Sequence, residues 1–257
     1  MSVEIPHYIQ FSHVYKTFDK PVLVDVSFSV DPGETLAIIG RSGVGKSVSL
    51  GHIMGFLKPD SGDVYVGHRR INDLDESELR KIRKKVTMVF QSGALFDSMT
   101  VEENVLFSLE LRDDYDEENK DEIVKGLLEM VGLEEYGESY PNDLSTGHRR
   151  AVAIARALAA QPDCILYDEP TTGLDPVTSA IIDDLMVRMQ RQLGVTGIVI
   201  THDMRSAYTV GTRIAMLYQG RVRQVGTVDE IRHSTDPIVR QFIEGRPVLD
   251  APAAAHR

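Results

Sequence analysis

The sequence has little cysteine and fewer basic than acidic residues. Its 257 residues include one cysteine, 28 lysines and arginines, and 39 aspartates and glutamates, for a formal net charge of -11. A lone cysteine cannot form an intramolecular disulfide, and the apolar neighbours of Cys164 predict a buried thiol in a reducing compartment. The acidic balance argues against nucleic acid as a partner, because phosphate backbones are bound by clustered basic residues.

Long hydrophobic runs are also missing. No window reaches 18 uninterrupted apolar residues, and the first thirty residues lack a basic segment followed by a long apolar one. We therefore predict neither a transmembrane helix nor a signal peptide, and any membrane role is expected to come through a partner. With 42% hydrophobic and 26% charged residues, the composition is typical of a folded α/β domain, alone or with a subdomain.

The first part of the chain reads as a β layer followed by a strand, a loop and a helix. Residues 22–31 alternate between apolar and polar, which predicts a half-buried strand in an antiparallel layer. An apolar strand at 35–39 then leads through a glycine-rich loop to a helix from Lys46 to about Leu57. A short strand at 64–66, a charged helix at 76–85 and a strand at 86–90 are expected next.

The rest of the chain is predicted to be helical at first and then alternating. Thr100 and Glu103 can form a capping box, and the following residues to about 160 look mostly helical. Strands are then expected at 164–167, 197–200 and 214–218, with a helix from Pro176 capped by Asp175. Repeated β-α-β order implies a parallel sheet. The tail from 248 to 257 has no periodicity and is predicted to be disordered.

The glycine-rich loop fits G-x-x-x-x-G-K-[ST] between a strand and a helix, as that phosphate-binding motif requires. Its members are Gly40, Arg41, Ser42, Gly43, Val44, Gly45, Lys46 and Ser47. Backbone N–H groups of such a loop surround phosphate oxygens at the positive end of the helix. Lys46 is suited to the β and γ phosphates and the Ser47 hydroxyl to Mg²⁺, so we predict ATP and Mg²⁺ as ligands. A purely structural turn has no need of the lysine.

Two acids follow the strand at 164–167. Asp168 and Glu169 are expected at the carboxyl end of a buried parallel strand, where α/β sheets bind ligands. Asp168 is suited to Mg²⁺, and Glu169 to polarising the water that attacks the γ-phosphorus. A strand-end turn explains Pro170 but not the acid pair. His202 would lie at the same edge, either as a hydrogen-bond partner of the phosphate or water, or as an ordinary loop residue.

The stretch DLSTGHRRAVAIARAL, residues 143–158, joins a polar cluster to a helical pattern. Ser145 or Thr146 can be an ordinary N-cap of that helix. The same helix start can also bind an anion. From these residues alone, both interpretations stay open.

Taken in order, these motifs resemble the nucleotide-binding subunit of ABC transporters across roughly residues 8–245. The resemblance implies an α/β P-loop NTPase fold of the ABC type, with a mixed sheet, an antiparallel β layer and an inserted helical subdomain. It places the ATPase domain at 1–245, with the core at 1–90 and 161–245 and the helical subdomain at about 91–160. A flexible tail, 246–257, is expected after it.

The resemblance also assigns roles to residues. It implies Gln91 as the Q-loop residue that reaches Mg²⁺ and assists catalysis, Asp168 and Glu169 as the Walker B aspartate and the catalytic glutamate, and Lys46 as a catalytic cation. It further implies that His202 is the switch histidine. Asp175 of the D-loop and Phe18 are implied to bind ATP, with Phe18 stacking on adenine. The alternative for Phe18 is a strand-end core residue.

In this family the helix after the signature acts on the nucleotide of the other subunit. Ser145 and Gly147 are therefore expected to contact ATP held by the phosphate loop of a partner copy, which implies a homodimer. The usual LSGGQ is changed at two positions, with Thr146 for a glycine and His148 for the glutamine. A Cβ at position 146 is expected to crowd the phosphate or to shift the backbone.

A finer resemblance lies in residues 88–105 and 236–247, which look like the ATPase of bacterial Mla/MCE phospholipid transport systems (MlaF-like). It implies an MlaE-like permease, an MCE-domain (MlaD-like) protein, in some such systems a small regulatory subunit, and a place on the cytoplasmic face of the inner membrane. The apolar residues Leu95, Phe96 and Met99 fit either a permease groove or packing within the helical subdomain. Alternatives are an amino-acid or metal importer, or a non-transport ATPase such as an FtsE-like division regulator.

Overall fold

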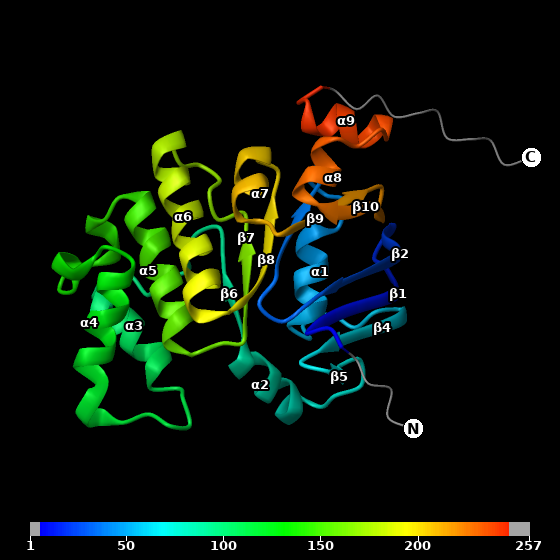
Figure 1. Ribbon diagram of the computed structural model, residues 1–257. Helices are drawn as coiled ribbons and strands as arrows, with labels where there is room; N and C mark the ends of the chain where they lie inside the picture. The colour runs from blue at the N-terminus through cyan, green and yellow to red at the C-terminus, as the bar shows by residue number, and fades with distance from the viewer. Residues whose placement is uncertain (1–5, 247–257) are drawn as a thin grey trace, which may run out of the picture.

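The computed structural model describes residues 6–246. The chain forms two sheets, with helices between them and on their outer side (Figure 1). The predicted tail lies, apart from Arg246, outside the described residues. Within the described range, no helix combines the length and apolar character that a bilayer span demands.

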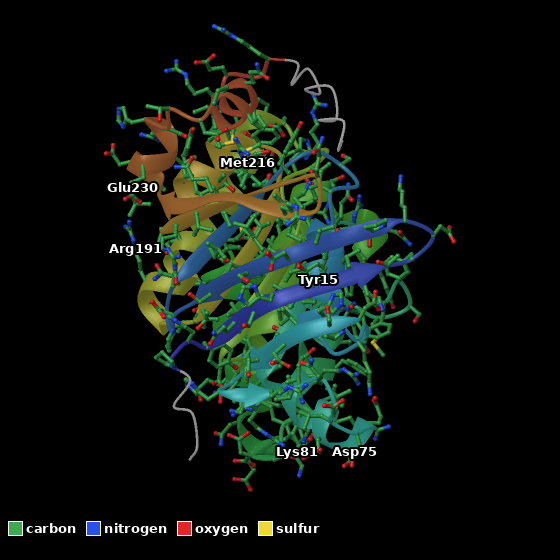
Figure 2. All side chains as sticks on the ribbon, turned by 90° about the vertical axis from the view of Figure 1, so that its right-hand side faces the viewer. Tyr15, Asp75, Lys81, Arg191, Met216 and Glu230 are labelled. Carbon is green, nitrogen blue, oxygen red and sulfur yellow. The ribbon has the colours of Figure 1, made fainter. Side chains whose placement is uncertain are left out.

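The smaller sheet is the predicted antiparallel layer. Its order is β2-β1-β4-β5, and its strands are β1 (Ile9–Thr17), β2 (Pro21–Val30), β4 (Ser61–Val66) and β5 (Arg69–Arg70). Figure 2 looks onto these strands. On the buried face Phe11 stacks on Phe28 with ring centroids 4.5 Å apart. The sequence pattern did not predict β1, because register shifts after Phe11 and Val14 interrupt its alternation of inward and outward residues.

The larger sheet has the order β10-β9-β3-β8-β7-β6. Its strands are β3 (Thr35–Ile39), β6 (Val86–Val89), β7 (Cys164–Asp168), β8 (Thr196–Thr201), β9 (Arg213–Tyr218) and β10 (Arg221–Thr227). All neighbours pair in parallel except β9 and β10, which confirms a mixed sheet. Every residue of β3 and β8 is buried, so these strands read as near-continuous apolar runs. Cys164 is fully buried, as predicted, and burial raises the pKa of its thiol.

Helix α1 (Lys46–Ile53) packs between the two sheets, where Leu50 and Ile53 share a core with Phe11 of β1 and Ile38 of β3. It ends before the predicted Leu57. Gly55 adopts a left-handed φ of 66°, and the next two amides donate back to the Gly51 carbonyl. The charged helix α2 (Glu76–Lys85) has the predicted bounds.

The remaining helices flank the larger sheet. Helices α3 (Val101–Leu109), α4 (Lys120–Met130) and α5 (Thr146–Ala159) lie at the edge of the molecule opposite the antiparallel layer (Figure 1). The Thr100 capping box of α3 is present as predicted. Helix α6 (Pro176–Leu193) joins them in one hydrophobic cluster with β7. After β8 come α7 (Met204–Val210), α8 (Val228–Arg232) and α9 (Pro237–Ile243).

Candidate active site

The loop at residues 40–45 connects β3 to α1 and depends on glycine. Gly40 has φ 149°, and a Cβ there would lie 2.4 Å from the Leu217 carbonyl oxygen. Gly45 has φ 105°, and a Cβ would lie 2.6 Å from Cδ2 of Leu23. Gly45 is also the N-cap of α1 and offers no side-chain cap, so the first helical N–H groups are left for a ligand.

Lys46 is buried at the start of α1, with 6% of its side chain exposed. Its ammonium donates to the carbonyls of Gly40, at 2.7 Å, and Arg41, at 3.1 Å. Its Nζ lies 3.8 Å from Oε1 of Glu169. Burial lowers the pKa of Lys46, while Glu169 and Asp168 oppose this shift. The loop therefore holds a desolvated cation in a fixed place.

Ser47 and Asp168 meet next to this cation. The Ser47 hydroxyl donates to Oδ1 of Asp168 at 3.2 Å. Burial raises the pKa of Asp168, so its carboxylate would gain from a further cation. A hydroxyl and one carboxylate fit Mg²⁺ that takes its other ligands from phosphate and water. Over residues 6–246 no group of three or more His, Cys, Asp or Glu side chains is placed to hold a metal ion.

Glu169 is held in an unusual conformation between β7 and β8. Its φ of 52° is rare for a residue with a side chain, and its amide donates to the Ile200 carbonyl at 3.0 Å. Thr172 donates to Oε2 of Glu169 at 2.7 Å, and Nδ1 of His202 lies 2.6 Å from the same oxygen. The structure thus brings His202 to Glu169, as the strand order predicted. Thr172 was not predicted, although its spacing from Glu169 allowed such a contact.

Gln91 is exposed in the loop after β6, and two arginines of α5 hold this loop. Arg150 donates to the Phe90 carbonyl at 2.9 Å. Arg156 donates to the carbonyls of Gly93, at 3.1 Å, and Ala94, at 2.8 Å. Neither arginine was predicted to have a role. A signal was present, because both lie in a helix whose other residues are mostly small and apolar.

The start of α5 is built as an N-cap. The Ser145 hydroxyl accepts the His148 amide at 3.1 Å, which confirms the predicted cap. A Cβ at Gly147 would lie 2.3 Å from Cγ2 of Thr178, so the glycine lets α5 approach α6. Asp175 caps α6 by accepting the amides of Val177, at 2.9 Å, and Thr178, at 3.0 Å.

These residues are not brought to the phosphate loop of their own chain. Within residues 6–246, the hydrogen bonds of Ser145 and Asp175 stay within their own helix starts, and Gly147 lies against Thr178. Figure 1 shows α5 well apart from α1, with β7 and β8 between them in that view.

Phe18 follows β1 and is 53% exposed, so its interpretation as a core residue is wrong. The Lys16 ammonium lies 5.5 Å from the ring centroid. The exposed part of the ring is available to a planar ligand.

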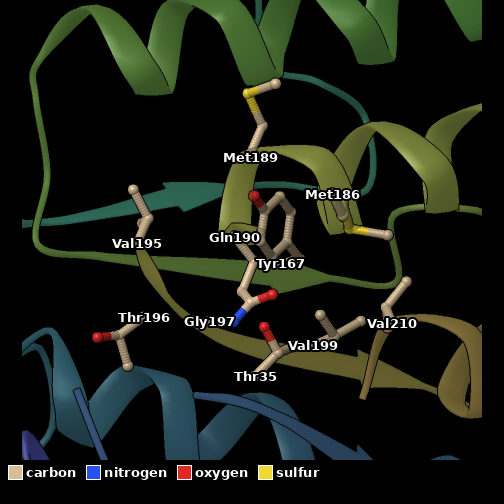
Figure 3. Close-up of a pocket in the computed structure, with 10 residues that line it drawn as sticks. All are labelled: Thr35, Tyr167, Met186, Met189, Gln190, Val195, Thr196, Gly197, Val199 and Val210. Atoms are coloured by element: carbon tan, nitrogen blue, oxygen red, sulfur yellow. The ribbon is translucent and has the colours of Figure 1, made fainter. Parts of the chain in front are cut away.

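A small cavity lies between α6, α7, β3, β7 and β8 (Figure 3). Its lining includes Tyr167, Met186, Met189 and Gln190. The Gln190 amide donates to the Gly33 carbonyl at 2.6 Å, and burial raises the pKa of Tyr167. This space, about 10 Å³, is too small for a nucleotide.

Comparison with known proteins agrees with this geometry. Residues 23–172 match the ABC transporter family. The chain belongs to the ABC transporter family. The fold is that of its ATP-binding cassette, and the chain carries the ATPase domain of this family.

Two relatives and one solved structure illustrate the match. The methionine import ATP-binding protein MetN of Carboxydothermus hydrogenoformans is 41% identical over 220 residues, covering 85% of this chain and 65% of the relative. The chain thus spans just under two thirds of that relative. The chloroplastic protein TRIGALACTOSYLDIACYLGLYCEROL 3 of Arabidopsis thaliana is 38% identical over 262 residues, covering 95% of this chain and 75% of the relative.

The solved structure is the dimeric ATP-binding cassette MJ0796 in a post-hydrolysis state with ADP and Pi. It superposes with a TM-score of 0.77 at 36% identity and covers 86% of this chain and 98% of the other. Its ligands are products of ATP hydrolysis. The comparisons confirm the ABC fold and ATP as the ligand of such cassettes, and leave the Mla-like resemblance unconfirmed.

Proposed function

We propose that this chain is the ATP-hydrolysing subunit of an ABC transporter and drives a membrane permease as a homodimer. The observation that carries the proposal is the convergence of Lys46, Ser47, Asp168, Glu169 and His202 from separate elements on one edge of the sheet. The test is steady-state ATP hydrolysis by the purified chain with Mg²⁺. Absence of hydrolysis, both alone and with its permease, would refute the proposal.

Each residue has a role that its position supports. Lys46 binds the β and γ phosphates with the backbone of residues 40–47, while Ser47, Asp168 and Gln91 hold Mg²⁺, which supplies charge neutralisation when bound. Glu169 accepts the proton of the attacking water, and His202 keeps the Glu169 carboxylate oriented. Phe18 stacks on the adenine.

The dimer places the signature of one copy on the nucleotide of the other. Ser145 and Gly147 start a helix whose N-terminus is suited to an anion, yet α5 lies well apart from α1 in the same chain (Figure 1). The matched cassette is dimeric. We therefore propose that Ser145, Gly147 and Asp175 act across the interface of a head-to-tail pair.

An aromatic pair in the helical region is proposed as the permease contact. Phe96 and Phe107 are 40% and 36% exposed, and their ring centroids lie 4.9 Å apart. Leu95 instead packs into the helical core, so the alternative of internal packing holds for that residue. Exposed aromatic pairs are typical anchors for a partner helix.

Phe96→Ser tests this surface. It should abolish copurification with the permease and leave basal ATP hydrolysis intact. Phe56→Ser is the matched control, because Phe56 is 60% exposed and its ring lies under Arg83, away from α3. Retention of the permease by Phe96→Ser would refute the assignment.

For the cargo, the relatives favour the predicted alternative of another importer over phospholipid transport. MetN proteins of six bacteria match at 37 to 43% identity, and all are named for methionine import. We therefore propose import of an amino acid or similar small solute, with the chain on the cytoplasmic face of the membrane. No feature favours an FtsE-like regulator.

A lipid cargo is the second candidate. It is supported by the Arabidopsis relative, whose name contains a glycolipid and which aligns with 95% of this chain. It would require an MlaE-like permease and an MCE-domain protein, with or without a small regulatory subunit. Identification of the copurifying membrane proteins separates the two, since an MCE-domain protein would overturn the amino-acid assignment.

A further inference from the structure

A buried polar cluster lies between α6 and α7. Asp183 of α6 is 2% exposed, Ser206 of α7 is fully buried, and Thr171 is 6% exposed. The Ser206 hydroxyl donates to Oδ1 of Asp183, and the hydroxyl oxygens of Thr171 and Ser206 lie 3.4 Å apart. Three segments that are distant in sequence therefore meet at these three side chains.

Each of the three segments leads to the candidate active site. Thr171 is in the loop between Glu169 and Asp175, and its neighbour Thr172 donates to Glu169 at 2.7 Å. α6, which carries Asp183, begins at the Asp175 cap. α7, which carries Ser206, begins two residues after His202.

We propose that Asp183 is a positioning residue for ATP hydrolysis, because it ties α6 and α7 through Ser206 to the loop that holds Glu169. This inference rests on the proposed function. Asp183 touches neither substrate nor reacting atoms, and it acts through Ser206 and Thr171.

The hydrogen bonds of the cluster have a direction. Ser206 has one hydroxyl proton and donates it to Asp183, so Thr171 must donate to Ser206. The chain of donors thus ends on the carboxylate. A charged acceptor makes such a bond stronger than a neutral one, so the ionised carboxylate holds the loop more firmly.

The Asp183 carboxyl group can gain or lose its proton near neutral pH. Burial raises the pKa of Asp183 to about 6; the Ser206 hydrogen bond lowers it and Asp203 raises it. Asp203 is itself bound to the Arg205 amide at 2.8 Å. Within residues 6–246 no basic side chain forms an ion pair with Asp183. The other charged groups on the elements around it are Asp184, Arg188 and Arg191 of α6, Arg205 of α7, and Asp168, Glu169, Asp175 and His202 in and after the strands.

The test compares kcat and KM for MgATP from pH 5 to 8.5 in three variants of the full chain. Asp183→Asn keeps the acceptor oxygen but removes the charge, and Ser206→Ala removes the link. Asp184→Asn is the matched control, since Asp184 is the next residue, 67% exposed and paired with Arg188. Thermal unfolding without nucleotide is measured over the same pH range.

With Asp183→Asn, we expect kcat to fall about threefold below wild type at pH 8, to match it at pH 5, and KM to stay unchanged. Ser206→Ala should lower kcat at every pH. The Asp183 pKa is higher in the folded than in the unfolded state, so wild type loses stability as pH rises through the folded-state pKa. Asp183→Asn has no such loss, and its melting temperature relative to wild type should therefore rise with pH.

Two results would overturn the inference. One is a ratio of kcat values for Asp183→Asn and wild type that does not change with pH, and the other is an equal effect of Asp184→Asn. A wild-type protein that hydrolyses no ATP at any pH would instead refute the proposed function. The pH dependence of unfolding in the absence of nucleotide then still reports whether Asp183 titrates in the folded chain, which separates the two failures.

Discussion

The starts of α1 and α5 both offer a helix N-terminus to an anion, but the chain equips them differently. At α1, Gly45 leaves the first amides free, and Lys46, Ser47 and the β7 carboxylates of the same chain surround the space. At α5, Ser145 caps its own helix by accepting the His148 amide. Within residues 6–246, its side chain forms no hydrogen bond with a charged group that could also bind phosphate.

The difference is that the α1 end brings charged side chains together, whereas the α5 end relies on its helix start. At the α1 end, the Lys46 ammonium lies next to the Ser47 hydroxyl and the Asp168 carboxylate, which are proposed to hold Mg²⁺. The α5 end has only a helix dipole, a hydroxyl and a glycine, so it is useful where another surface already holds the nucleotide. The comparison therefore favours complementary half-sites on two copies.

The largest effect is expected at the α1 half. Lys46→Ala removes the desolvated ammonium, and ATP affinity should fall about a hundredfold or more, since hydrogen bonds to charged groups contribute roughly 1.5–3 kcal/mol each. Fluorescent-nucleotide titration measures this. Lys85→Ala is the control, because Lys85 is 60% exposed. Wild-type affinity in Lys46→Ala would contradict the assignment of the phosphate loop.

Glu169→Gln should separate binding from chemistry. General-base loss typically lowers rates by about 100-fold or more, so kcat should fall by that factor while ATP affinity persists. Thr172 can still donate to the amide oxygen, so the loop should stay in place. Single-turnover hydrolysis and nucleotide binding measure the two effects. Glu138→Gln, at an exposed position, should behave as wild type, and normal turnover in Glu169→Gln would remove Glu169 from its role.

Gly147 is expected to have two functions that a pair of variants can separate. Gly147→Ala places a Cβ 2.3 Å from Cγ2 of Thr178 and should lower the free energy of unfolding by about 1–3 kcal/mol. Thr178→Ser removes that methyl group but keeps the hydroxyl. In the double variant we expect stability to recover and ATP hydrolysis to stay low, because the start of α5 is proposed to lie against the partner's nucleotide and the added methyl group remains there.

Thermal unfolding and kcat are measured for wild type, the two single variants and the double variant. If the double variant recovers both quantities, Gly147 serves only the packing of α5 on α6.

The smallest effect is expected at Thr146. Its hydroxyl accepts from Arg149 at 3.0 Å, and Thr146→Gly removes this bond and the Cβ. Because the Cβ is predicted to crowd the partner's phosphate, kcat should rise about two- to threefold, while the glycine costs up to about 1 kcal/mol of stability. Steady-state kinetics and thermal unfolding measure both. An unchanged or lower kcat would show that Thr146 does not obstruct the site.

Local signals made much of the fold predictable. The buried run of β3, the capped starts of α3 and α6 and the charged helix α2 depend on neighbouring residues, and each has the predicted start. β10 was missed because a register shift between Val222 and Gln224 breaks its alternation. The short helices α7, α8 and α9 give too few turns for a periodic pattern.

The site was predictable where a motif is contiguous, and less so where contacts are distant. Residues 40–47, Asp168 and Glu169 follow from motif and strand order. Arg150 was missed because its partner, Phe90, is 60 residues away, and Asp183 because its partner, Ser206, is 23 residues away. The small apolar neighbours of Arg150 in α5 mark it as unusual, but the partner in each pair depends on tertiary packing, which the local pattern does not identify.

The most direct test of the central claim is the mass of mixed dimers in the Glu169→Gln background with ATP and Mg²⁺. One chain carries Lys46→Ala and the other Ser145→Arg, so each lacks one half of the site. Light scattering should find each alone at 28.6 kDa, and the mixture partly at twice that mass, since the pair restores one composite site. A mixture that stays monomeric, while Glu169→Gln alone dimerises, would contradict the arrangement in trans.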